Sequence, residues 1–294
     1  MNIVSFLTII PFLKSRTEIM QYKSASASHG SHFGYRRGFE DDLTEYRNYV
    51  KGDDLRYLDW NLYARTEKYY VKEGYQRSRQ SVFLWLDNSL SVKFSVKKYN
   101  LAWLLSLSLG YLFRQQKDKV YLYAEELKFN STQSVLQLEN PASFIGADET
   151  FIKETSAKIK KQKERRSILY AVKEAEKHLK KSNKIIWITD LYVPLDEFKK
   201  VLDICQEKKW KLSVLHITEE SEFNSAGLKR GYLKKLIDAE TGQWISSAKI
   251  KEYGQIWEEA VNKRARMLSA RNFSYIRGRT EDGPIHILGQ IKTI

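Results

Sequence analysis

Two short apolar runs that each end on an aspartate constrain the fold of this chain more than any other feature. Residues 82–86 are followed by Asp87, and residues 185–189 are followed by Asp190. An unbroken apolar run is typical of a central strand in a parallel sheet, which is buried on both faces. Because ligand crevices form outside the carboxyl ends of parallel strands, both acids are expected at one edge of the same sheet.

Strands alternate with helices through most of residues 81–277, which predicts an α/β fold with a mainly parallel central sheet and helices on both faces. An acidic turn between two short strand segments predicts a β-hairpin insertion near 230–247. Strands are expected at 82–86, 119–124, 135–138, 185–190, 211–217 and 273–276, and helices at 95–115, 149–164, 167–181, 194–208 and 249–270.

The chain has 294 residues, which is enough to bury a full core. We divide it into an N-terminal helix and loop (1–29), an N-terminal extension (30–80) and an α/β domain (81–294). The single cysteine, Cys205, implies no disulfide framework and is consistent with a reducing compartment.

The first apolar stretch, residues 3–13, is interrupted by Pro11 and has about half of the roughly 20 residues that a spanning helix needs. No basic residue precedes it, as one would in a signal peptide. A short docking or interfacial helix is the better interpretation. The predicted location is the cytoplasm, with peripheral contact to a membrane as an open alternative.

The positive charge of the chain is unevenly distributed. The formal net charge is +14, and residues 151–184 hold twelve Lys and Arg against four Asp and Glu. A solvated helical face is the simplest explanation for lysines at helical spacing. An anionic membrane surface or an acidic partner is a sharper one, and nucleic acid ranks lower because no recognition motif accompanies the charge.

The loop after the first acidic strand end has an unusual set of oxygen donors. Asp87, Ser89 and Ser91 alternate along it and place one carboxylate and two hydroxyls on a short segment before a helix. Mg²⁺ prefers six oxygen ligands and usually retains some waters, so this set suits it. A polar loop that only caps the next helix would have the same residue types. The spacing alone leaves both interpretations open.

Residues 45–65 combine arginines, acids and aromatic residues around a Gly52 turn. Arg47, Arg56 and Arg65 can each form bidentate bonds with an aspartate such as Asp53, Asp54 or Asp59. We interpret the segment as a structural cluster of Arg–Asp pairs under aromatic cover, and a catalytic pair of acids is the alternative.

Taken together, these motifs resemble those of the bacterial domain of unknown function 58 family. The resemblance runs from about Gly30 to the end of the chain and includes the hairpin at 238–242. It implies a Rossmann-like domain of the von Willebrand factor type A class. The matching residues are Tyr46-Arg47-x-Tyr49, Gly52-Asp53-Asp54-x-Arg56-x-x-Asp59-Trp60-x-x-Tyr63-Ala64-Arg65 and Asp87-x-Ser89-x-Ser91.

The resemblance also implies a metal-ion-dependent adhesion site that holds Mg²⁺ or another divalent cation. Asp87, Ser89 and Ser91 match its first motif, and Asp190 matches the acid at the end of a later strand. Ser167 stands where the family usually has a threonine. Members of this family commonly work with MoxR-type AAA+ ATPases, as chaperone-like pairs that assemble or mature other proteins.

The expected function is therefore a non-enzymatic, Mg²⁺-dependent protein-interaction adaptor with an AAA+ ATPase and a client protein as partners. Neither loop has a His or Cys for a nucleophile–base pair, and Ser89 stands where an aspartyl-phosphate phosphatase would have a second acid. Two alternatives remain: a metal-dependent phosphoester hydrolase that uses Asp87 and Asp190, and a basic membrane- or nucleic-acid-binding protein that uses residues 151–184.

Overall fold

The sheet predicted from the apolar runs is present in the computed structural model. The structure describes residues 9, 11–13, 36–37, 44–76, 80–124, 135–139, 167–180, 182–219, 235–237, 244–246 and 250–291. Contacts divide the chain into two compact units, one of Met1–Leu13 with Gln80–Ile294 and one of Lys14–Arg79. Each unit is described by itself below.

The larger unit is built on a six-stranded sheet with the order β11-β8-β7-β4-β5-β6. All neighbouring strands are parallel except β6, which pairs antiparallel with β5 at the edge. This confirms the predicted mainly parallel, Rossmann-like α/β sheet. The strands are β4 (Ser81–Leu86), β5 (Lys119–Ala124), β6 (Val135–Leu138), β7 (Lys184–Thr189), β8 (Lys211–Thr218) and β11 (Ser274–Arg279).

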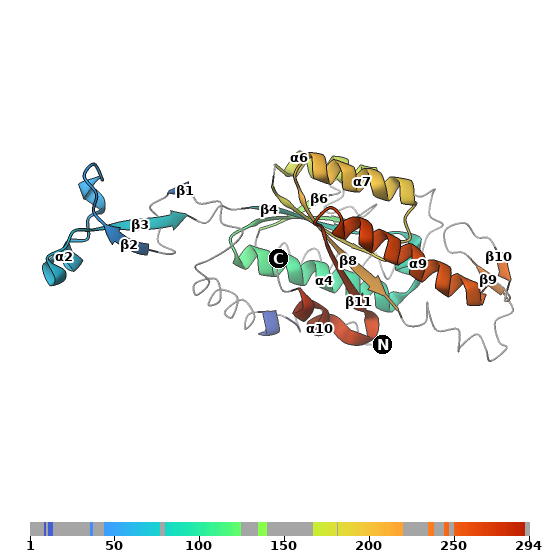
Figure 1. The fold of residues 1–294 in the computed structure, drawn as a ribbon. Coiled ribbons are helices and arrows are strands. Elements are labelled where there is room, and N and C mark those ends of the chain that lie inside the picture. The colour runs from blue at the N-terminus through green and yellow to red at the C-terminus, as the bar shows by residue number, and fades with distance from the viewer. Residues whose placement is uncertain are drawn as a thin grey trace. The chain divides into compact units, whose positions relative to one another are not determined.

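Helices cover both faces of this sheet (Figure 1). Alternate side chains of each strand point to opposite faces, and both sets of side chains are apolar in the central strands, so both faces must be covered. On one face Leu84 and its even-numbered neighbours pack with α4 (Val96–Gln115) and α10 (Gly283–Gln290). On the other face Phe83 and Trp85 pack with the remaining long helices. These are α6 (Leu169–His178), α7 (Leu195–Glu207) and α9 (Ile250–Ser269).

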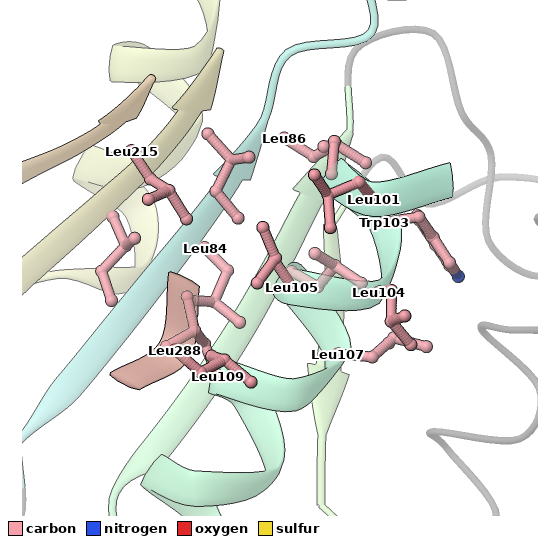
Figure 2. Close-up of a cluster of buried hydrophobic side chains, with 14 of the residues drawn as sticks. Leu84, Leu86, Leu101, Trp103, Leu104, Leu105, Leu107, Leu109, Leu215 and Leu288 are labelled. Atoms are coloured by element: carbon pink, nitrogen blue, oxygen red, sulfur yellow. The ribbon is translucent and has the colours of Figure 1, made fainter. Parts of the chain in front are cut away.

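Helix α4 forms the centre of the first face. Its sequence is apolar nearly all round, and residues such as Leu101, Leu105 and Leu109 are buried. Figure 2 shows the leucines of α4 beside β4, with Leu215 of β8 and Leu288 of α10 in the same cluster. A helix that is apolar on every side is stable in water only when neighbouring elements cover it, as here.

The second face is dominated by aromatic packing. Trp85 of β4 and Trp187 of β7 stack with ring centroids 4.2 Å apart and planes 5° apart. Phe198 of α7 lies against Trp187 with a centroid distance of 5.9 Å. Cys205 is buried on the same helix, and burial raises the pKa of its thiol to about 12. The thiol is therefore protonated at neutral pH and packs as a small apolar core residue.

Both ends of the chain contribute to the α4 face. Residues 9 and 11–13 are helical, and Ile9 and Leu13 are buried in the α4 cluster, so this stretch docks on the core. The C-terminal apolar tail is the helix α10, which the sequence interpretation did not resolve. A side chain at Gly278 would come within 2.8 Å of Ile287, so glycine permits the close approach of β11 and α10.

The predicted hairpin insertion is confirmed, since β9 (Lys235–Ile237) and β10 (Trp244–Ser246) pair antiparallel. The helix expected at 149–164 lies outside the described residues, as does half of the basic segment 151–184. Among the helices that the structure describes, none combines the length and the apolar character needed to cross a membrane.

The smaller unit is a three-stranded antiparallel sheet with the order β1-β3-β2. Strand β3, which precedes the central strand β4 in the chain, belongs to this separate sheet. The elements are β1 (Arg36–Arg37), β2 (Thr44–Asn48), the 3₁₀ helix η1 (Leu55–Tyr57), α2 (Trp60–Thr66) and β3 (Tyr70–Gln76).

Candidate metal-binding edge

Asp87 and Asp190 lie at the same edge of the central sheet, as the two apolar runs predict. Strands β4 and β7 are parallel neighbours in which Leu86 pairs with Ile188, so each acid follows the end of its strand. The backbone N–H of Asp87 donates to the carbonyl of Ile188 at 2.8 Å and continues the pairing into the loop. Asp87 is 6% exposed and Asp190 is 1% exposed.

The carboxylate of Asp87 is held by two short hydrogen bonds. Its Oδ1 accepts from the backbone N–H of Ser89 at 3.0 Å, and its Oδ2 accepts from the hydroxyl of Thr189 at 2.6 Å. A carboxylate has about four acceptor positions, so these two bonds fix its orientation without using its full capacity.

The two serines of the loop also lie together. Ser89 is the N-cap residue of the short helix α3 (Leu90–Phe94), but its side chain makes no capping bond to that helix. Its Oγ lies 2.9 Å from Ser91 Oγ instead. The capping interpretation left open by the sequence therefore does not explain either hydroxyl. Leu90 and Ser91 are partly exposed.

The donor chemistry of this loop fits a divalent cation of the Mg²⁺ type, since Asp87, Ser89 and Ser91 offer hard oxygens on one short segment between β4 and the start of α3. The described residues contain no group of three or more His, Cys, Asp and Glu side chains that could hold a metal. A cation here would depend on the hydroxyls, on Asp87 and on water, which suits Mg²⁺ better than softer metals.

Asp190 is held by a cation that belongs to the chain itself. The ammonium group of Lys98 donates to Asp190 Oδ2 at 3.0 Å, and the two side chains are 2% and 1% exposed. The other oxygen, Oδ1, accepts from the backbone N–H of Tyr192 at 3.3 Å. The second acid of the edge is thus part of a buried ion pair.

The fifth predicted ligand, Ser167, lies in a different environment. It is exposed and its hydroxyl donates to Glu197 Oε2 at 3.1 Å. The same carboxylate oxygen accepts from the backbone N–H of Ile168, which joins the start of α6 to the first turn of α7. Within the described residues, Ser167 makes no hydrogen bond to the other four predicted ligands.

Three residues of this edge were not singled out from the sequence. Thr189 orients Asp87, Lys98 neutralises Asp190, and Glu219, which follows β8, accepts a hydrogen bond from the hydroxyl of Ser95. Three neighbouring strands thus end on, or next to, an acid. The sequence signal that could have drawn attention to Lys98 is its position in the first turn of the helix expected at 95–115, where a cation is unfavourable.

Below the edge, His216 of β8 is completely buried and pairs in register with Thr189 of β7. Its Nδ1 lies 2.8 Å from the hydroxyl of Tyr275. Burial lowers the pKa of His216 to about 3, and the positive charges of Arg277, Lys98 and Arg264 act in the same direction. The ring is therefore neutral at physiological pH and packs as a core residue.

This pKa shift predicts acid sensitivity. Between pH 6.5 and about 3 the unfolded chain binds a proton at His216 that the folded chain does not bind. The contribution of His216 to the free energy of unfolding is therefore fully present above pH 6.5 and is lost as the pH falls below that value. From pH 7 to pH 5 His216 should remove about 2 kcal/mol from the free energy of unfolding. Urea unfolding at several pH values would measure this loss.

The matched variants are His216→Asn, which keeps a polar group near the Tyr275 hydroxyl, and His286→Asn at an exposed position. The first should flatten the dependence of stability on pH far more than the second. An equally steep profile in the His216→Asn variant would show that other groups cause the acid sensitivity.

The smaller unit shows how its Arg–Asp signature is used. Arg47 forms a bidentate pair with Asp53 at 2.6 and 2.7 Å. Arg56 bonds to Asp54, and this pair is mostly solvent-exposed. Asp59 caps α2, because its side chain accepts from the backbone N–H of Leu62 at 2.9 Å. The first two acids thus pair with arginines, and the third is a helix cap.

The aromatic residues of this unit form a small stacked group at its surface. Tyr63 and Tyr69 stack at 4.6 Å, and Trp60 meets Tyr63 edge to face at 6.2 Å. Trp60 is 61% exposed and Tyr69 is 48% exposed. These rings are therefore open to solvent and do not shield the Arg–Asp pairs from water.

The fold and the edge define a class: an α/β protein with a hydroxyl-rich candidate cation loop at the carboxyl edge of a parallel sheet, and a small β-unit before it. The chain belongs to the family described as protein of unknown function DUF58, whose model matches residues 45–252. No curated protein matches the chain.

Two solved structures are similar to the chain at low identity. One is the conserved hypothetical protein BatB from Bacteroides thetaiotaomicron, at 15% identity and a TM-score of 0.38, covering 72% of this chain and 96% of that one. The other is an aerotolerance-related membrane protein from Bacteroides fragilis NCTC 9343 with multiple mutations to serines, at 16% identity and a TM-score of 0.40, covering 71% and 99%.

Proposed function

We propose that this protein is a non-enzymatic, Mg²⁺-dependent protein-interaction adaptor whose larger unit is a von Willebrand factor type A domain. The observation that carries the proposal is the grouping of Asp87, Ser89 and Ser91 at the end of the central strand, where the serine hydroxyls contact each other and do not cap α3. These residues would hold the ion, in the manner of a metal-ion-dependent adhesion site.

The ion would supply an open coordination position for a carboxylate of a partner protein. With one carboxylate and two neutral hydroxyls as protein ligands, most of the charge of Mg²⁺ remains uncompensated. An acidic side chain of a partner is the complementary ligand, and such a contact confers specificity as well as attraction. The partly exposed Leu90 and Ser91 would lie beside the incoming carboxylate.

The partner that we propose is a MoxR-type AAA+ ATPase, with which the adaptor would assemble or mature a client protein. Membership of the DUF58 family supports this choice, because the motifs of the chain resemble members that work with such ATPases. The proposal treats Mg²⁺ as a bridge between the two proteins, and it gives the edge no chemistry of its own.

The test is the capture of a purified MoxR-type ATPase from the same organism. The wild-type chain should bind it with Mg²⁺ and lose at least tenfold in affinity in EDTA. Asp87→Asn keeps an acceptor for the N–H of Ser89, and Ser91→Ala removes a partly exposed hydroxyl. Both variants should lose the Mg²⁺-dependent part of binding while their circular dichroism spectra stay unchanged.

The matched control is Asp203→Asn, which removes an exposed acid on α7. This variant should bind the ATPase as the wild-type chain does. Capture that persists in EDTA, or that survives Asp87→Asn, would contradict the metal bridge. Turnover of phosphoesters that Asp87→Asn abolishes would instead favour a metal-dependent hydrolase.

A further inference from the structure

Lys98 occupies a position that is unfavourable for a lysine on two counts. It is 1% exposed, and burial of an ammonium group is tolerated only when the charge is paired and hydrogen-bonded. It also lies in the first turn of α4, where the partial positive charge of the helix N-terminus opposes a cation. A specific anion must compensate for both effects, and Asp190 is at 3.0 Å.

The position of the ammonium group is fixed by its surroundings. Lys98 Nζ lies 5.8 Å from the centre of the Tyr192 ring, within the range of a cation–π contact. Tyr192 in turn stacks on Trp257 of α9 at 3.9 Å with parallel planes. Ser95, the N-cap residue of α4, accepts from the backbone N–H of Lys98 and donates to Glu219. Elements from both faces of the sheet thus hold Lys98 at the edge.

We propose that Lys98 sets the affinity of this edge for divalent cations, because its ammonium group competes with the metal for Asp190. The proposal rests on the cation site proposed above and adds its regulation. Asp190 follows the strand next to Asp87 and would otherwise be the second anionic ligand of the edge. With Lys98 paired to Asp190, Asp87 is the only carboxylate among the proposed cation ligands, so the isolated chain binds a divalent cation weakly.

Weak intrinsic affinity has a consequence for the adaptor. The carboxylate of a partner becomes the second anionic ligand that Asp190 does not supply. Cation and partner then bind together, each raising the affinity of the edge for the other. Lys98 thereby prevents the isolated chain from holding a tightly bound metal and makes metal binding depend on the complex.

The test measures Mn²⁺ binding by the electron paramagnetic resonance signal of the free ion. Lys98→Gln removes the charge but keeps an N–H donor toward Asp190, and it should bind Mn²⁺ at least tenfold more tightly than the wild-type chain. Lys98→Gln/Asp190→Asn should return to near the wild-type affinity. Lys98→Gln/Asp87→Asn should lose binding, which would place the ion at the proposed loop.

A second measurement covers Lys98→Met, which lacks any donor and is expected to fold poorly in EDTA. Mg²⁺ should raise its melting temperature several degrees more than that of the wild-type chain, because the metal replaces the missing ammonium group. Equal Mn²⁺ affinity of the Lys98→Gln variant and the wild-type chain, with binding lost in Asp87→Asn, would overturn this inference and leave the proposed site intact. Mn²⁺ binding in none of the variants would overturn both.

Discussion

Asp190→Asn is expected to lower the free energy of unfolding by about 3–5 kcal/mol, one of the two largest single-residue effects that we expect in this protein. The substitution leaves the ammonium group of Lys98 buried, at 1% exposure, without the carboxylate that lies 3.0 Å away. Removing one member of a buried pair leaves the full desolvation penalty of the other. Urea unfolding followed by far-ultraviolet circular dichroism measures the loss.

The control for this substitution is a surface ion pair of similar geometry. Lys208 and Glu176 lie 3.1 Å apart, but their side chains are 44% and 41% exposed. Glu176→Gln should therefore change stability by less than about 1 kcal/mol. If Asp190→Asn destabilised the protein no more than this control, the Lys98–Asp190 pair would not have the buried character described here.

The double variant Lys98→Met/Asp190→Asn separates two quantities: the penalty of leaving one buried charge unpaired, and the net contribution of the ion pair to the free energy of unfolding. Because neither charge remains, its stability should lie within about 2 kcal/mol of the wild-type value and well above that of Asp190→Asn. Simple addition of the two single losses would instead show that the residues act independently.

Trp187→Ala should destabilise the larger unit to a similar extent, by about 3–5 kcal/mol. Trp187 is fully buried in the central strand β7, where it stacks on Trp85 at 4.2 Å and contacts Phe198 of α7. Loss of the indole ring removes buried apolar area and leaves a cavity that the surrounding strands and helix fill only in part. Urea unfolding measured by circular dichroism avoids the change in tryptophan fluorescence.

Trp187→Phe is the graded control, because it keeps an aromatic ring for Trp85 and Phe198 and leaves a smaller cavity. It should lose clearly less stability than Trp187→Ala. Equal losses in the two variants would show that the stacking contact contributes little. A loss below about 1 kcal/mol for Trp187→Ala would contradict the packing described for this face.

Much of the larger unit could be predicted from local patterns. The runs before Asp87 and Asp190 identified β4 and β7, and the predicted spans of β5 and β6 agree with the structure to the residue. These patterns suffice because a strand that is buried on both faces must be apolar throughout. The C-terminal helix α10 was missed because Gly283, Pro284 and Gly289 are typical turn residues, and its three aliphatic residues are too few to show a helical period.

The candidate site was predictable only where it depends on chain order. The loop residues Asp87, Ser89 and Ser91 lie within five positions, and a strand end determines where they lie. The surroundings of Ser167 were not predictable, since its contact with Glu197 joins the residue before α6 to the first turn of α7, 30 residues further along the chain. Periodicity carries no information about which loop a given hydroxyl meets.

The sequence by itself determined that this chain forms a parallel sheet with Asp87 and Asp190 at one edge, because backbone pairing and side-chain burial follow local patterns of apolar residues. Only the tertiary structure decided that these acids differ in environment. Lys98 lies 92 residues before Asp190, and α4 must pack on the sheet before the two charges meet. One acid is therefore held by hydroxyl and amide donors, and the other by a buried ammonium group.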